Sequence, residues 1–197
     1  MLAALWSAAA GGDTDSAAAF VPDTLAGRLP SVVAAGTYVI TTDVVVRQGK
    51  TVLLESGTVL LFGEFTGVKV HGTLLARGKK DRPIVFTSVN NKQYNPDAKV
   101  EAAPYDWNGI HILEDGAGTH FAYCAVSYSV YGIMSLTKYI RLGPTVFRSN
   151  GRADLTIAGE EHEVGEVPYE YSLTVQQAAG EGVPLTVLRD PNAPKRN

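Results

Sequence analysis

The sequence predicts an all-β fold, a parallel β-helix in which about five coils of strands stack along one axis. The first observation is a repeat. Short apolar segments recur about every 23 residues, and they are centred on Val45, Val68, Ile110, Ile133 and Leu155. The second is that apolar and polar residues alternate with a period of two inside these segments, which is typical of strands. A fixed period of this length indicates a stacked repeat, because each unit can bury its apolar face only against its neighbours.

One interval departs from the repeat. Val68 and Ile110 lie 42 positions apart, and between them is a polar, proline-bearing stretch of 18 residues, 89–106, whose removal leaves 24. We therefore predict that residues 36–158 form the β-helix and that 89–106 is an insertion in it. A loop of this length inside a compact domain is usually functional or disordered.

The alternation also predicts which side chains face the core. In the segment that begins at Gly67, we expect Val68 and Val70 to point inward and Lys69 and His71 to point outward. Glycines stand between the segments, where the chain has to turn. Helical periodicity is almost absent between residues 36 and 157, which excludes the helical solenoids.

Five segments carry a family resemblance: residues 67–78 (GVKVHGTLLARG), 83–88 (PIVFTS), 107–112 (WNGIHI), 121–128 (FAYCAVSY) and 145–150 (TVFRSN). They resemble the right-handed parallel β-helix repeat proteins of bacteria, which share the pectate-lyase-like superfold. The resemblance implies a right-handed coil. It leaves the function open, because that family includes polysaccharide lyases and hydrolases, adhesins and non-catalytic surface proteins.

Residues 1–35 are expected to form a signal-like segment, a linker and an N-terminal cap. Residues 1–12 are apolar and rich in alanine, as in a secretory signal, but the basic start of such a signal is missing because the first arginine is Arg28. We expect residues 25–33 to cover the first coil, since a coil end exposes strand edges. We also expect the chain to be the soluble part of an envelope protein, tethered through one end or docked to membrane-embedded partners.

Residues 159–190 are expected to form a C-terminal capping hairpin, and residues 191–197 a proline-broken tail. Two alternating segments, 171–175 and 183–188, would be the strands of the hairpin. Several glutamates at 160–170 interrupt the repeat before it. We interpret that group as flexible and therefore unsuited to acid–base chemistry.

Charge and cysteine content exclude some functions. The chain has 17 basic and 20 acidic residues, a net charge of −3, and no basic stripe that would neutralise phosphates, so nucleic acid is not an expected partner. The densest basic cluster, Lys79, Lys80 and Arg82, is interpreted as a solvated turn. The single cysteine, Cys124, excludes an internal disulfide and is expected to be a buried apolar side chain.

The sequence predicts no catalytic residues, no metal site and no cofactor. Enzymes built on this fold need clustered carboxylates on neighbouring coils, or an acid set together with lysine or arginine. None of the expected outward positions is a carboxylate; they are Lys69, His71, Thr73, Arg77, His111 and Ser135. The four histidines have no recognised ligand spacing.

The insertion is the predicted contact site for a ligand or partner. It brings aromatic rings together with amides and carboxylates, which is what a sugar ring or a protein surface contacts. The candidate residues are Tyr94, Asp97, Tyr105, Asp106 and Trp107. The alternative for Tyr105 and Trp107 is that they fold back and cover the side of the coil.

These observations favour a non-catalytic scaffold or binding module of the bacterial cell envelope, located outside the cytoplasm. Its partner would be an envelope protein complex or a cell-surface glycan. The first alternative is a carbohydrate-active enzyme, a polysaccharide lyase or hydrolase. The second is an end-to-end β-helix polymer, which is disfavoured because the hairpin and the tails would block the ends. The oligomeric state stays open.

Overall fold

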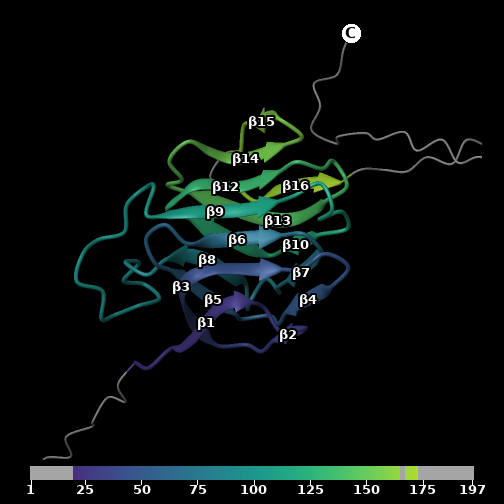
Figure 1. Cartoon of the computed structure of the whole chain (residues 1–197). Coiled ribbons are helices and arrows are strands. Elements are labelled where there is room, and N and C mark those ends of the chain that lie inside the picture. Colours follow the sequence, from purple (N-terminus) through teal and green to yellow (C-terminus); the bar gives the residue numbers. More distant parts are fainter. Residues whose placement is uncertain (1–19, 165–166, 173–197) are drawn as a thin grey trace, which may run out of the picture.

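The computed structural model describes residues 20–164 and 167–172, and these residues form an all-β structure with no helix (Figure 1). The strands belong to one 16-stranded sheet that is mostly parallel and does not close on itself. Successive strands bend around a common interior, so the arrangement fits a β-solenoid. The predicted all-β class and parallel pairing are therefore confirmed. Residues 1–12, predicted to be signal-like, and the tail 191–197 lie outside the described residues.

One column of parallel strands defines what we name the β9 face (Figure 1). Its strands, in order, are β1 (Asp23–Arg28), β3 (Thr37–Val46), β6 (Gly67–Val70), β9 (Trp107–Ile112), β12 (Ser129–Ser135) and β14 (Ala153–Ile157). From β3 to β14, the register places one apolar side chain of each strand in line: Val44, Val68, Ile110, Ile133 and Leu155. All of these are at most 1% exposed, so this row is the centre of the core.

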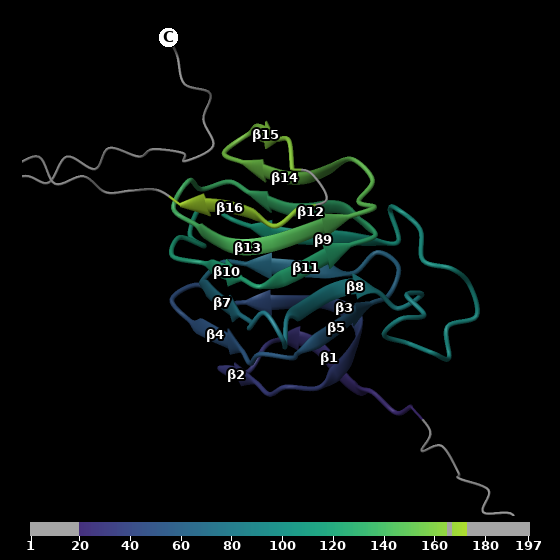
Figure 2. The ribbon, with the colours of Figure 1, turned by 180° about the vertical axis from the view of Figure 1, so that it is seen from behind.

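A second column defines the β8 face, which Figure 2 shows from behind. It pairs the first half of β3 with β5 (Val59–Phe62), β8 (Ile84–Ser88), β11 (Cys124–Ser127) and the second half of β13 (Arg141–Arg148). A third column defines the β7 face. It contains β2 (Val32–Val33), β4 (Thr51–Leu54), β7 (Thr73–Arg77), β10 (His120–Ala122) and the first half of β13.

The centre of one repeat segment is shifted by one residue, and one predicted side-chain direction is wrong. Val45 pairs with Lys69 and is half-buried, and its neighbour Val44 occupies the core row. Ser135 was expected to point outward, but it pairs with Ile112, is fully buried, and donates its hydroxyl to the Thr137 carbonyl at 2.7 Å. In the first case three consecutive valines hide the alternation, and in the second the local hydrogen bond satisfies a buried polar group.

The first and last strands of the described chain pair with the strands of the three faces. Residues 25–33, expected to be a cap, lie mainly in β1 and β2, which pair in parallel with β3 and β4. At the other end β15 (Glu160–His162) pairs antiparallel with β14, and β16 (Tyr169–Ser172) pairs antiparallel with β13. The glutamates of β15 are thus part of a strand rather than a flexible segment. The second strand of the predicted hairpin, 183–188, lies outside the described residues.

The insertion joins β8 to β9 and leaves the stack sideways as a long loop (Figure 1). It follows the buried strand β8 and precedes the strand whose first residue, Trp107, is fully buried. Both ends of the loop are therefore fixed by the core, whatever the loop itself contacts.

The core row makes a stability prediction. Replacing Ile110 by Asp buries an unpaired carboxylate at a position with 0% exposure, so we expect the free energy of unfolding to fall by more than about 4 kcal/mol, enough to prevent folding. The matched control is Val32→Asp, because Val32 is 48% exposed at the outermost strand of the β7 face. Urea denaturation followed by circular dichroism measures both. Equal losses in the two variants would contradict the core assignment.

Candidate functional site

Asp106 fastens the two ends of the insertion to each other and to the stack. Its Oδ2 accepts hydrogen bonds from the Ser88 hydroxyl at 2.5 Å, the Asn90 side-chain amide at 3.2 Å and the Ala103 N–H at 3.2 Å. Its own N–H donates to the Tyr128 carbonyl at 2.9 Å. Asp106 was predicted as a contact residue, but the structure gives its carboxylate an internal role in shaping the loop.

Tyr105 is held against the stack while most of it stays accessible. Its hydroxyl donates to the Gly151 carbonyl at 2.9 Å, and its N–H donates to the Ser129 carbonyl at 3.3 Å. The ring lies on Gly151, where an added Cβ would come within 2.4 Å of a ring carbon. The residue is nevertheless 60% exposed. Its ring is therefore positioned before any partner arrives, which lowers the entropy cost of binding.

Tyr94 and Asp97 lie in the first half of the insertion, which is built from consecutive turns. The Tyr94 N–H donates to the Asn91 carbonyl at 3.0 Å. Tyr94 is half-buried, and burial raises the pKa of its phenol although the positive charge of Arg148 acts in the opposite direction. Asp97 is exposed. Of the predicted contact residues, Asp97 and Tyr105 are thus exposed and Tyr94 is partly so.

Trp107 is removed from the candidate contact residues. It has 0% exposure, and its ring stacks on Phe62 with centroids 4.0 Å apart and planes 8° from parallel. Its Nε1–H donates to the Ser127 carbonyl at 2.8 Å, which satisfies the polar end of a buried indole. The alternative weighed for this residue, that it packs on the coil, is the one the structure shows.

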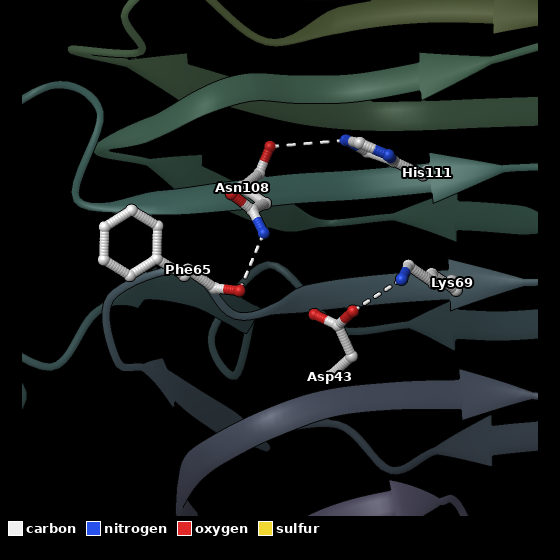
Figure 3. A network of polar contacts seen from close by, with 5 residues as sticks. All are labelled: Asp43, Phe65, Lys69, Asn108 and His111. Carbon is white, nitrogen blue, oxygen red and sulfur yellow. Dashed lines mark hydrogen bonds and ion pairs between the residues drawn. The ribbon is translucent and has the colours of Figure 1, made fainter.

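Phe65 is an exposed aromatic residue beside the insertion that the sequence analysis missed. It is 84% exposed in the turn between β5 and β6, and the Asn108 side-chain amide donates to its carbonyl at 2.8 Å (Figure 3). The turns β5–β6, β8–β9, β11–β12 and β13–β14 all connect the β8 face to the β9 face, and we name this edge the insertion corner. The sequence does contain a sign that Phe65 is exposed, because this large apolar residue stands in a short turn between Gly63 and Gly67.

The backbone at the insertion corner is left-handed in four successive turns. Phe65 (φ 59°), Tyr105 (φ 75°), Tyr128 (φ 64°) and Ser149 (φ 51°) lie one in each turn. This conformation is uncommon for residues other than glycine and disfavours a bulky side chain by about 1 kcal/mol or more. Glycine or asparagine would fit these positions with less strain, so three aromatic residues there are a feature that folding alone does not require.

A row of polar side chains crosses the outer surface of the β9 face (Figure 3). The Lys69 ammonium lies 2.6 Å from the Asp43 carboxylate, and Lys69 pairs with His111 on the next strand. The His111 Nε2 lies 3.4 Å from the Asn108 carbonyl, a marginal hydrogen bond. The expectation that no outward position is a carboxylate is therefore wrong, since the Asp43 side chain is 30% exposed. The alternation of Asp43 with the buried Val44 already contained that signal.

The side chains of this row are poorly suited to acid–base catalysis. Burial lowers the pKa of His111, and Lys69 adds to that lowering, so the imidazole is biased toward its neutral form. The Asp43 carboxylate is paired with Lys69, and the Asp115 carboxylate faces His71 at 3.5 Å. Hydrolysis of a glycosidic bond uses two carboxyl groups about 5 to 9.5 Å apart. The geometry suits an ion pair that supports the sheet surface.

The cysteine thiol is buried, and the described residues contain no cluster of metal ligands. Cys124 is 3% exposed, and burial raises the pKa of its thiol to about 12. Within residues 20–164 and 167–172, no three His, Cys, Asp or Glu side chains gather as metal ligands would. No helix in the described part of the chain has the length and apolarity needed to cross a membrane.

Comparison with known proteins gives one partial similarity. No family model matches the chain, and no solved structure matches it. A stretch of 56 residues is 43% identical to a protein named Protein bark beetle of Drosophila melanogaster. The match covers 28% of this chain and 2% of that protein, so the chain spans only a small part of that relative's length.

Two aspartates of the insertion provide a matched test of how the loop is held. Asp106→Ala removes the acceptor for three donors, and we expect the free energy of unfolding to fall by about 1–3 kcal/mol. Trypsin should then cleave faster after Lys92 and Lys99, which lie inside the loop. Asp97→Ala, at an exposed site, should leave both properties unchanged. Equal cleavage rates in the two variants would show that Asp106 does not fix the loop.

The raised pKa of the Cys124 thiol predicts that the stability of the fold depends on pH. The folded protein keeps the Cys124 proton, whereas the unfolded chain releases it near the ordinary thiol pKa of 9.0. The stability associated with this buried thiol is therefore fully present below about pH 9 and is lost progressively toward about pH 12. Urea denaturation of the wild type and Cys124→Ala between pH 7 and 10.5 measures it. The wild type should lose more stability above pH 9, and parallel curves would contradict the assignment.

Proposed function

We propose that this chain is a non-catalytic binding module that acts outside the cytoplasm, and that it contacts a protein or glycan partner through the insertion corner. In this proposal the scaffold is a right-handed parallel β-helix of about five coils, closed by caps at its two ends. The all-β, mostly parallel pairing supports it, and the handedness follows from the sequence resemblance. The insertion 89–106 is then the one long departure from a regular stack.

The observation that carries the proposal is the state of Tyr105. The residue is tied down by its hydroxyl, by its N–H and by its seat on Gly151, and it still leaves 60% of its surface exposed. A tyrosine that served only to cover the coil would be expected to bury its ring, as Trp107 does. A rigid, exposed ring with a polar tip is what binding surfaces for sugars and proteins use.

The surroundings of Tyr105 support the same reading. Phe65 presents an exposed ring from the turn of β5–β6 at the same edge, with a left-handed backbone. The strain at these positions is consistent with a contact surface, because residues held in sparsely populated conformations concentrate at functional sites. The insertion carries two lysines and three acidic residues, so it has little net charge. Stacking and hydrogen bonding, rather than long-range attraction, would then dominate the contact.

The proposed location rests on two features of the sequence. The apolar residues 1–12 and the likeness to surface β-helices support a position outside the cytoplasm, in a cell envelope, with a tether or a membrane-embedded partner. The bacterial origin predicted from that likeness stays a prediction. The partial similarity described above is to an animal protein.

Binding should depend on the rings of the insertion corner. We expect Tyr105→Ala to weaken partner binding by about 1–3 kcal/mol, and Phe65→Ala to add to that loss, because exposed aromatic anchors dominate such contacts. Deleting residues 91–104 and joining the ends by a short glycine-containing turn should abolish binding while the sheet stays folded. Recovery of partners from an envelope extract and binding to a neutral glycan array measure the effect.

The control is Tyr139→Ala, because Tyr139 is a similarly exposed tyrosine, at 58%, in the connection between β12 and β13. If Tyr105→Ala and the deletion recover partners as well as the wild type does, the insertion corner is not the binding site. If Tyr139→Ala lowers recovery by the same amount, the effect is a general loss of exposed aromatic surface.

The Asp43–Lys69–His111 row favours one alternative, a carbohydrate-active enzyme. Its polar groups lie on neighbouring parallel strands of one exposed face, where a polymer could lie across them. Incubation with acidic and neutral polysaccharides, followed by an assay for new reducing or unsaturated ends, tests it. New ends that disappear in Lys69→Met would establish the enzyme and overturn the non-catalytic proposal.

A further inference from the structure

The structure gathers basic side chains that are scattered in the sequence. Arg77, Lys79, Lys80 and Arg82 lie at the end of β7 and in the turn to β8, where Lys79 and Arg82 bond to each other through their backbones. Strand β13 stacks over the same edge with its middle residues; Arg141 begins the strand on the β7 face, opposite His120, and Arg148 ends it on the β8 face, opposite Ser127. We name this edge, where the β7 face meets the β8 face, the basic corner. Its four cations, together with Arg141 and Arg148 at the two ends of β13, are exposed and make no ion pair with another described residue.

Two of these charges, those of Arg77 and Arg141, act on a common neighbour, His120. Burial lowers the pKa of His120, and the positive charges of Arg77 and Arg141 lower it further. Both of these arginines are thus close enough to His120 to act on it, from strands on either side of β10. The whole chain has a net charge of −3, so a concentration of cations at one edge is not a consequence of overall composition.

A hollow of about 480 Å³ lies at the basic corner, on the β8 face. Lys80 and Arg148 stand in its wall. The rest of the lining is mostly apolar, and it includes Pro83, Pro144 and Tyr123. Tyr123 has a left-handed backbone (φ 49°) and is 40% exposed, so it repeats here the strained, exposed aromatic seen at the insertion corner.

A second hollow lies on the other side of the Lys79–Arg82 turn. It has a volume of about 560 Å³, and Arg77 and Arg82 stand in its wall together with Leu53 and Glu55. The two hollows and the turn between them follow the stacking direction of the strands, from β4 through β7 and β8 to β13. The surface is therefore long enough for an extended segment rather than for a single small ion.

We propose that the basic corner is a docking surface for an acidic segment of a partner protein, one that places a large apolar side chain in the proline- and tyrosine-lined hollow and its carboxylates against Lys80 and Arg148. Charge complementarity selects the carboxylates, and the apolar floor selects a peptide over other anions. A nucleic acid or a sulfated glycan would neutralise the cations but leave the floor uncovered. At Arg148, which ends strand β13 and whose positive charge also acts on Tyr94, this surface borders the insertion. The inference does not rest on the function proposed above.

The probes are fluorescent peptides of 12 residues, studied with the full-length protein by fluorescence anisotropy. The first peptide has glutamates on both sides of a central Phe-Leu pair. The second has serines in place of the apolar pair, and the third has glutamines in place of the glutamates. Heparin and polyglutamate serve as anions without an apolar group. We expect the first peptide to bind at least about tenfold more tightly than the others at 0.15 M salt, and its binding to weaken as salt is raised.

Charge reversal locates the site. Lys80→Glu with Arg148→Glu should weaken the first peptide at least about tenfold and leave the weak binding of the glutamine peptide unchanged. Lys50→Glu is the matched control, because Lys50 is an exposed lysine between β3 and β4, away from the basic corner. Circular dichroism and thermal melting verify that all variants fold. Unchanged affinity in the double variant would overturn the proposal, as would equal or tighter binding of heparin or polyglutamate.

A photo-crosslinker identifies the occupant. p-Benzoylphenylalanine in place of Val146, a half-buried residue of the hollow wall, should crosslink to the first peptide. Crosslinking within the chain to residues 173–197, or between two copies, in the presence of saturating peptide would show that the hollow is already filled. Either result overturns the proposal, and so does the absence of any peptide crosslink.

Discussion

The constraint on which the rest of the structure depends is the in-register stacking of parallel strands. Each strand must align one apolar side chain with those above and below it, as Val44, Val68 and Ile110 do. Once that register is fixed, the turns stack too, because each has the same position on its coil. Features separated by 20 or 40 residues then become neighbours in space. The two edges that carry the proposals, the insertion corner and the basic corner, exist for this reason.

Both corners expose aromatic side chains from turns with a left-handed backbone, but the groups around these side chains differ. At the insertion corner, left-handed turns expose Phe65 and Tyr105 beside a loop of little net charge. At the basic corner, a left-handed turn exposes Tyr123 among cations. A rigid stack is well suited to this role, since strain in one turn is carried by the pairing of the strands on either side. The stacked strands hold the turns in fixed positions, and the side chains in the turns would contact the partner.

Alternation and spacing predict the strands, the core row and the insertion, because these depend on contacts that repeat with the period of the chain. They fail where the pattern is locally ambiguous or the contact is specific. Three consecutive valines hide that Val44 and Val46 are fully buried while Val45 between them is half-buried. The burial of Trp107 depends on Phe62, 45 positions earlier, which no period reveals. The grouping of Arg77 with Arg141 requires the pairing of β7, β10 and β13, so a cluster that looks like a solvated turn in the sequence becomes part of a larger surface.

The contact between Tyr105 and Gly151 has an evolutionary consequence. The two residues lie 46 positions apart, yet the ring occupies the space that a side chain at position 151 would need. Substitutions at these positions are therefore coupled: a relative that gains a side chain at 151 has to lose or redirect the aromatic ring at 105. The insertion could vary in length and composition between relatives as long as this pair is kept. In an alignment, such a pair would covary across an otherwise variable loop.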